Sequence, residues 1–231
     1  TYYYLKRTDA SRVYGLELEH MLSPYNLNFL VNQSTLIEEH IAGIPGDHFI
    51  KEFLPQCTDA EKAQIAKEYV KFNERSMIRL LGDMRAYNYV VVPTHDFDQV
   101  VYKIRPIDFD QQSFEGKLSV YRPQFFKENK ALMDLVRTKL NHNSINQYKI
   151  EERSIVARRI ISSGSRLQSL VRIMQSETLT LQENLERLRQ EIFKFTKDKA
   201  FKQSESMGDI MQASLSFVRL HYEKVDMHNL F

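Results

Sequence analysis

The residues best suited to chemistry lie in two short segments of this chain. The first segment contains Asp83 and, five residues later, Asn88, whereas the second contains Asp108 and Asp110. Carboxylate and amide oxygens bind magnesium, and a carboxylate beside a hydroxyl group can act as the base in phosphoryl transfer from ATP. The spacing of Asp83 and Asn88 predicts one tight loop that holds both a base and a metal ligand.

Two apolar runs between these segments must position them. The runs at 89–92 and 99–107 predict a β-hairpin joined by a turn of several residues. A hairpin returns the chain to where it started, so we expect Asp108 to meet the same ion as Asn88. The letters Asp-Phe-Asp also occur at 96–98, but that copy follows Asn88 too closely to leave room for two paired strands.

The order helix, Asp-x-x-x-x-Asn loop, hairpin and Ile-Asp-Phe-Asp resembles the protein-kinase-like fold. It is most similar to the branch of aminoglycoside phosphotransferases and HipA-type kinases, over residues 1–115. The resemblance implies that Asp83 is the catalytic base, that Asn88 and Asp108 bind Mg²⁺, and that Asp110 assists them.

The same resemblance gives roles to residues near the N-terminus. Lys6 ends a Tyr-rich strand and resembles the kinase lysine that contacts the nucleotide phosphates. A helix predicted at 9–22 follows, and its Glu17 would be the partner of Lys6. Glu17 lies inside the apolar arc of this helix, whereas Glu19 is predicted to point away.

Two further strands, predicted at 27–32 and 35–41, complete this region. The second strand resembles the segment that leads into the hinge and binds adenine through backbone hydrogen bonds. The residues at that position are Glu39, His40 and Ile41. A Gly-Ile-Pro-Gly run comes directly afterwards and predicts a joint between two parts of the chain.

Together with these patterns, the resemblance implies an α+β, bilobal protein-kinase-like fold. Residues 1–42 would form the remainder of a truncated, small, β-rich N-lobe. Residues 43–231 would form a large, mainly helical C-lobe, with the catalytic loop and hairpin at 81–110. No proline follows Pro123, so the second half should be almost entirely helical, with breaks near 141–146, at Gly164 and near 202–208.

Composition narrows the class of protein. The chain is 42% hydrophobic and 27% charged, which is typical of a folded, soluble protein. Its 32 basic and 30 acidic residues nearly balance, so we expect no nucleic-acid partner. Cys57 is the single cysteine, which favours a reducing, cytoplasmic location. The sequence contains no apolar run long enough to span a membrane.

The predicted function is therefore an ATP- and Mg²⁺-dependent phosphotransferase. Its partners would be a nucleotide and a hydroxyl-bearing acceptor, either a small molecule or a protein. The alternative is a pseudokinase-like binding or scaffold module without efficient catalysis. Leu81 favours this alternative, because these families usually have a histidine there that braces the metal loop.

The beginning of the chain also bears on this choice. The glycine-rich phosphate loop of the fold would lie upstream of Lys6, where no such loop occurs. The chain opens on a predicted strand without an initiator Met, so we expect further residues to precede Thr1. A third reading, an all-helical interaction protein, would require the apolar runs at 89–107 not to be strands.

Overall fold

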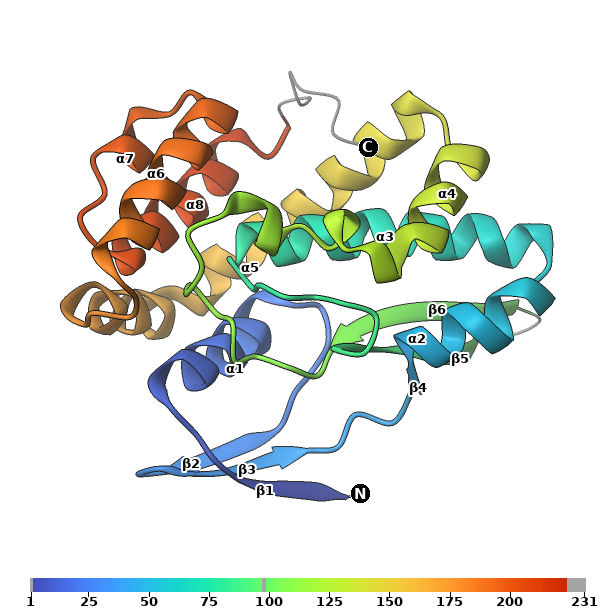
Figure 1. Cartoon of the computed structure of the whole chain (residues 1–231), viewed down its shortest axis with the longest axis horizontal. Helices are drawn as coiled ribbons and strands as arrows, with labels where there is room; N and C mark the ends of the chain where they lie inside the picture. The colour runs from blue at the N-terminus through green and yellow to red at the C-terminus, as the bar shows by residue number, and fades with distance from the viewer. Residues whose placement is uncertain (1, 97–98, 224–231) are drawn as a thin grey trace.

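The N-terminal part of the chain is a three-stranded antiparallel sheet with one helix packed on it. The computed structural model describes residues 2–96 and 99–223, and the strands of this sheet pair in the order β1-β3-β2. At the bottom of Figure 1 the helix lies between this sheet and the rest of the molecule. The elements are β1 (Tyr3–Arg7), α1 (Ala10–Leu22), β2 (Phe29–Asn32) and β3 (Thr35–Glu39).

Local sequence explains where α1 begins and which way β3 faces. The Asp9 carboxylate accepts a hydrogen bond from the Arg12 amide at 3.0 Å, which satisfies a free donor of the first helical turn. In β3, Leu36 and Glu38 are buried, while the residue between them is exposed. The inward face of the sheet therefore carries an acidic side chain that needs a cationic partner.

A second antiparallel sheet begins just after the predicted joint. Its strands pair in the order β4-β5-β6, and they are β4 (Ile44–Pro45), β5 (Tyr89–Asp96) and β6 (Gln99–Pro106). The predicted hairpin is confirmed, but its turn is shorter than predicted. The ladder continues past Thr94 opposite Val101, because β-branched side chains pair well across strands. Residues 97–98, which belong to the earlier Asp-Phe-Asp copy, lie outside the described residues.

Helices form most of the remaining chain, as the proline-free second half predicts. They are α2 (Gly46–His48), α3 (Asp59–Ile78), α4 (Lys130–Lys139), α5 (His142–Ser176), α6 (Gln182–Thr196), α7 (Lys199–Lys202) and α8 (Met207–His221). The predicted break at Gly164 is confirmed, because its φ of 45° kinks α5. A further break after Ser176 is not predicted by the sequence. There Glu177 accepts a hydrogen bond from Tyr14 of α1.

Single helical turns connect the longer elements. A π-helical turn, η1 (Phe49–Phe53), follows α2, and the 3₁₀ turns are η2 (Leu54–Gln56), η3 (Leu118–Tyr121), η4 (Pro123–Phe125) and η5 (Lys127–Asn129). The last three turns carry the chain from the hairpin to α4, so the helical half begins later than the last proline alone would indicate.

One hydrophobic cluster joins the two sheets across the predicted joint. Leu36 and Ile41 from the N-terminal part are buried in the same cluster as Phe49 and Tyr69 from the helical part. The chain is therefore an α+β protein whose layout is compatible with two lobes. Its core continues from one part to the other, so the N-terminal sheet is held against the helices by buried apolar area.

Candidate functional site

The two segments singled out by the sequence lie side by side. The Ile107 amide donates a hydrogen bond to the Asn88 carbonyl at 3.0 Å, and Leu81 forms an isolated β-bridge with Gln112. The hairpin of β5 and β6 returns the chain to the loop that follows α3, as predicted. Leu81 is buried, so it serves as a packing residue where a bracing histidine is expected by the resemblance.

The loop from Asp83 to Asn88 is closed by its own hydrogen bonds. Asp83 adopts a left-handed backbone conformation with φ of 56°, which turns the chain sharply. The Asn88 side-chain amide donates to the Asp83 carbonyl at 2.7 Å and to the Asp83 carboxylate at 3.3 Å. The predicted tight loop is thus present, and it brings the candidate base and the candidate metal ligand into contact.

Arg85 binds the candidate base directly. Its Nε donates to the Asp83 carboxylate at 2.7 Å, and its Nη1 donates to Glu128 at 3.1 Å. The hydrogen bond to Asp83 is the main reason why the pKa of Arg85 is raised. Asp83 therefore lies beside a fixed positive charge, which holds its carboxylate in one orientation at the partly exposed mouth of the loop.

Asp108 and Asp110 are held by Arg12, an arginine that the sequence patterns do not single out. Arg12 Nη1 lies 3.2 Å from Asp108 Oδ1 and 2.6 Å from Asp110 Oδ1. The side chain of Arg12 is only 7% exposed, whereas those of Asp108 and Asp110 are 36% and 59% exposed. Burial opposes the charge of Arg12, but its hydrogen bonds to Asp110 and Glu38 outweigh this effect and raise its pKa.

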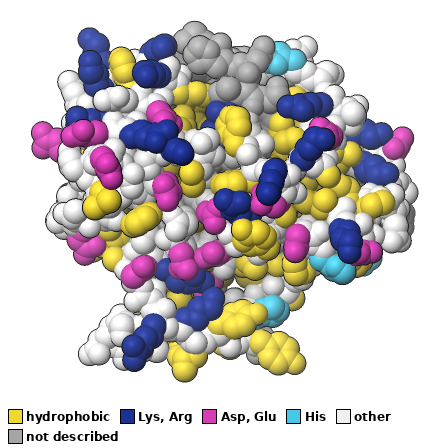
Figure 2. Space-filling view, in the orientation of Figure 1, with side chains coloured by type: hydrophobic (Ala, Val, Ile, Leu, Met, Phe, Trp, Pro, Cys, Tyr) yellow, Lys and Arg dark blue, Asp and Glu magenta, His cyan; other side chains and the backbone are white. Residues whose placement is uncertain are grey.

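Glu38 connects these residues to Lys6. Its carboxylate accepts from Arg12 Nη2 at 3.0 Å and from Lys6 Nζ at 3.3 Å. A continuous line of ion pairs therefore runs from Lys6 on β1, through β3 and α1, to Asp108, two residues after β6. Figure 2 shows acidic and basic side chains interspersed at the narrow junction between the N-terminal sheet and the rest of the molecule.

The predicted pairing of Lys6 with Glu17 is wrong. Glu17 instead forms an ion pair with Arg166 of α5 at 2.7 Å, while Lys6 pairs with Glu38. The prediction that Glu19 points away is also wrong, because Glu19 is buried and pairs with Arg79. Helix α1 is buried on most of its surface, so its apolar arc does not identify the side that faces the sheet.

Two signals in the sequence could have found the correct partner. Glu38 lies two residues after Leu36, and alternation along a strand places both on the same buried face. Arg12 lies on the first turn of α1, directly after the strand that carries Lys6. A basic residue there and an acidic residue on the inward strand face together indicate an ion pair.

The predicted hinge residues are engaged mainly with the N-terminal sheet. The Glu39 amide donates to the Asn28 carbonyl at 2.9 Å, and the His40 amide donates to the Tyr2 carbonyl at 2.8 Å. Ile41 is buried in the core. These bonds occupy two of the amide donors that the resemblance assigns to adenine, so a nucleotide base would have to use other backbone groups of this segment.

The predicted metal ligands offer oxygen donors but do not form an assembled metal centre among the described residues. In the described ranges, no three His, Cys, Asp or Glu side chains gather closely enough to hold a metal ion. Asp108 and Asp110 nevertheless share one cationic atom, Arg12 Nη1, so the pair already binds a positive charge. Asn88 would supply an amide oxygen, and hard oxygen donors of this kind suit Mg²⁺.

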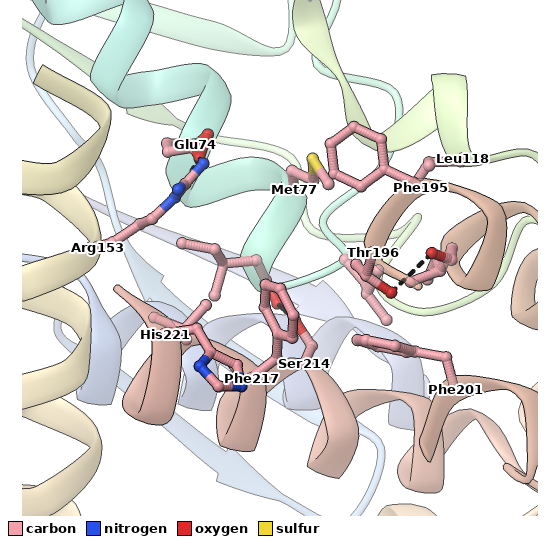
Figure 3. Close-up of a pocket in the computed structure, with 14 residues that line it drawn as sticks. Glu74, Met77, Leu118, Arg153, Phe195, Thr196, Phe201, Ser214, Phe217 and His221 are labelled. Atoms are coloured by element: carbon pink, nitrogen blue, oxygen red, sulfur yellow. Dashed lines mark hydrogen bonds and ion pairs between the residues drawn. The ribbon is translucent and has the colours of Figure 1, made fainter. Parts of the chain in front are cut away.

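A separate apolar pocket lies in the helical part, between α3, α6 and α8. Figure 3 shows Phe195 and Phe217 on its walls and Glu74 facing Arg153 at one side. Glu74 accepts a hydrogen bond from Arg153 Nε at 2.6 Å. The Ser214 hydroxyl donates to a backbone carbonyl of α3 at 2.7 Å. These polar groups are bonded within the protein, so the pocket offers weaker recognition chemistry than the ion-pair line.

Comparison with known protein families, with curated proteins and with solved structures found no match to this chain. Across residues 2–96 and 99–223, no helix combines the length and the apolar character needed to cross a membrane. The residues whose arrangement bears on function are Lys6, Arg12, Glu38, the Asp83 loop and the acidic pair.

Proposed function

We propose that this chain is an ATP- and Mg²⁺-dependent phosphotransferase of the protein-kinase-like fold. It transfers a phosphoryl group to a hydroxyl of a small molecule or a protein. The observation that supports this proposal most strongly is the ion-pair line from Lys6 to Asp108. It joins a lysine on the N-terminal sheet to a carboxylate beside the Asp83–Asn88 loop, although these elements are far apart in sequence.

The order of elements supports the kinase-like fold. Strand β1, which carries Lys6, is followed by a helix, two further strands and a linker. After the linker come a helix, the tight acidic loop and a hairpin, and Asp108 lies two residues after the hairpin. This order agrees with the resemblance from strand β1 to the acidic segment. The contacts across the linker support the proposal further, because Leu36 of β3, which pairs with Lys6 of β1, shares one hydrophobic cluster with Met84 of the loop.

Each residue then has a distinct role. Asp83 accepts a hydrogen bond from the acceptor hydroxyl and orients it toward the phosphoryl group. Lys6 contacts the nucleotide phosphates, and Glu38 keeps the lysine in place. Asn88 and Asp108, assisted by Asp110, would hold the magnesium ion, which would supply charge neutralisation.

A pseudokinase-like module is the second candidate, and one observation favours it. Every carboxylate of the site is already paired with an arginine, namely Asp83 with Arg85 and the acidic pair with Arg12. Such a site can remain folded and bind a ligand without efficient transfer. Leu81 agrees with this candidate, since a buried leucine offers no polar group to the loop.

Thermal unfolding with and without ATP and Mg²⁺ tests nucleotide binding. A ligand at one hundred times its dissociation constant stabilises the folded state by about 2.7 kcal/mol. We expect the melting temperature of the parent to rise and that of Asp108→Asn to rise much less. Asp59→Asn, which changes a highly exposed carboxylate of α3, is the matched control and should behave like the parent. If ATP stabilises none of these proteins, the phosphotransferase is wrong.

Turnover separates the two candidates. We expect a phosphate-release or label-transfer assay to detect activity in the parent and not in Asp83→Asn. Asp83→Asn should still be stabilised by ATP, because Asp83 acts on the acceptor and not on the nucleotide. ATP binding without turnover in the parent would support the pseudokinase-like module instead.

A further inference from the structure

We propose that the free edge of β1 is a dimerisation surface, where β1 of a second copy of this chain pairs with it antiparallel about a two-fold axis at Leu5. The two N-terminal sheets then form one continuous sheet. This inference does not depend on the proposed function, because it concerns the outer edge of the sheet and not the Asp83 loop or the acidic pair.

Strand β1 is an open edge of its sheet. Within residues 2–96 and 99–223, β3 is its one neighbouring strand, and their register is unbroken from Tyr3 to Arg7. In Figure 1, β1 lies at the lower border of the molecule, far from the long helices. The strand contains no proline, and Leu5 at its centre is 74% exposed. Such an edge is a template for pairing with another chain.

The backbone of β1 has three residues that can pair on this side. The His40 amide donates to the Tyr2 carbonyl at 2.8 Å, and the Thr8 amide donates to the Ser34 carbonyl at 2.9 Å. Backbone groups alternate in direction along an antiparallel strand, so the even-numbered residues between Tyr2 and Thr8 face β3. The amide and carbonyl groups of residues 3, 5 and 7 therefore point toward the open edge.

A two-fold axis at Leu5 gives a self-complementary register. It places the two Leu5 side chains opposite each other and Tyr3 opposite Arg7 of the second copy. On the other face, Tyr4 lies opposite Lys6 of the second copy. Each cation then faces an aromatic ring, which attracts it, and no like charges lie opposite each other. The single chain already contains this kind of contact, since Lys6 Nζ lies 5.0 Å from the centre of the Tyr4 ring.

The same register extends an apolar row on the outer face of the sheet. Leu5, Ile37 of β3 and Leu30 of β2 lie opposite one another across the three strands, and all are exposed. The buried Leu36 and Glu38 occupy the opposite face. Figure 2 shows apolar side chains gathered at this border of the molecule. In the dimer the two rows meet at Leu5, where their contact removes apolar area from water.

The other edge of the sheet offers a poorer surface. The Glu39 amide donates to the Asn28 carbonyl, so the outward backbone groups of β2 belong to Phe29 and Val31. The left-handed conformation of Gln33, with φ of 54°, then turns the chain back. Pairing of β1 with β2 of another copy would also be head-to-tail and would leave further edges open, whereas pairing of β1 with itself closes at two copies.

Analytical ultracentrifugation over a concentration series tests the proposal. We expect the parent to reach twice the monomer mass, and Leu5→Lys and Leu5→Asp each to dimerise at least about tenfold more weakly, because like charges would lie opposite each other. Ile161→Lys changes a comparably exposed aliphatic side chain of α5 and should match the parent. A parent that is monomeric throughout the series, or that grows beyond a dimer, overturns the proposal.

A mixture of the two variants tests the position of the axis. Because the axis places residue 5 opposite itself, an equimolar mixture of Leu5→Lys and Leu5→Asp brings opposite charges together and should restore the dimer. A mixture that stays monomeric overturns the register and the proposal with it.

Amide hydrogen exchange of the parent tests the edge without any variant. The amides of Tyr3, Leu5 and Arg7 should exchange more slowly as the protein concentration rises, while those of Phe29 and Val31 should not change. Exchange at Leu5 that is independent of concentration overturns the proposal, and it does so even where a Leu5 variant does not fold.

The alternative occupant of this edge is a strand formed by residues that precede Thr1. A longer protein that carries such residues, stays monomeric and exchanges the Leu5 amide slowly at every concentration would assign the edge to that strand and overturn the proposal. A longer protein that still dimerises and is disrupted by Leu5→Lys would support it.

Discussion

Two arginine–carboxylate networks of this chain use the same chemistry in different surroundings. In the helical interior, Arg75 pairs with Glu68 at 2.8 Å and with Glu152 at 3.2 Å, and all three side chains are buried. At the site, Arg12 is equally buried, but the carboxylates of Asp108 and Asp110 reach solvent. The two networks differ in the exposure of their carboxylates. Exposure, and not the ion pair itself, therefore distinguishes a site open to ligands from a buried ion pair that only stabilises the fold.

A further buried arginine, Arg79, connects the helical interior to α1 and to the acidic segment. Arg79 pairs with Glu19 of α1, and the Arg79 carbonyl accepts a hydrogen bond from Gln112 after the acidic segment. Burial raises the pKa of Glu152 despite the neighbouring Arg75, as expected where charge is removed from water. These groups fix α1, α3 and the acidic segment relative to one another. Because they are buried, they are not accessible to a ligand.

The largest expected effect is on the interior network. Arg79→Met removes the partner of Glu19 and leaves a carboxylate buried without a positive charge. We expect the free energy of unfolding to fall by about 3–5 kcal/mol, measured by urea denaturation. Arg166→Met, which breaks the partly exposed pair with Glu17, is the control and should cost less than about 1 kcal/mol. A similar loss of unfolding free energy in both variants would mean that the buried and the partly exposed ion pair contribute equally to stability.

The second effect concerns the site and is seen in activity, not in stability. Asp83→Asn should lower phosphotransfer by at least about a hundredfold, since a positioned base typically contributes that much. Its urea midpoint should stay close to that of the parent, because Asp83 is partly exposed and the amide can keep its bond to Arg85. An Asp83→Asn enzyme as active as the parent removes Asp83 from its proposed role.

The third effect tests how closely α1 approaches the acidic segment. A Cβ atom added at Gly15 would lie 2.9 Å from Phe109 Cβ and 3.2 Å from the Phe109 carbonyl oxygen. Gly15→Val should therefore lower the free energy of unfolding by about 1–3 kcal/mol and weaken stabilisation by ATP. Ala10→Val, at the exposed start of α1, serves as the control. Unchanged stability of Gly15→Val would show that α1 can shift without cost.

The smallest effect distinguishes the observed partner of Lys6 from the predicted one. Glu17→Gln breaks a partly exposed pair and should change the free energy of unfolding by less than about 1 kcal/mol. It should leave stabilisation by ATP and Mg²⁺ intact, whereas Glu38→Gln should reduce it. The reverse result in thermal unfolding would restore Glu17 as the partner of Lys6 and remove Glu38 from the site.

Local patterns predicted much of the fold. The hairpin, the break at Gly164 and the contact between Asp83 and Asn88 depend on residues close together in the chain. Turn residues, strand alternation and glycine conformations act over such short separations, so a sequence shows them directly. The length of the hairpin turn is the exception, because cross-strand pairing extends the first strand to Asp96.

Residue types and their spacing are enough to indicate the functional groups: an Asp-x-x-x-x-Asn loop, an acidic pair after a hairpin, and a lysine on an early strand. The partners of these groups follow from the folded structure alone. Lys6 pairs with Glu38 and not with Glu17, and Arg12 reaches Asp108 although 96 residues separate them. Such pairs depend on how α1 is rotated against the sheet and the acidic segment. That rotation is set by packing around nearly the whole helix, which one apolar arc cannot reveal.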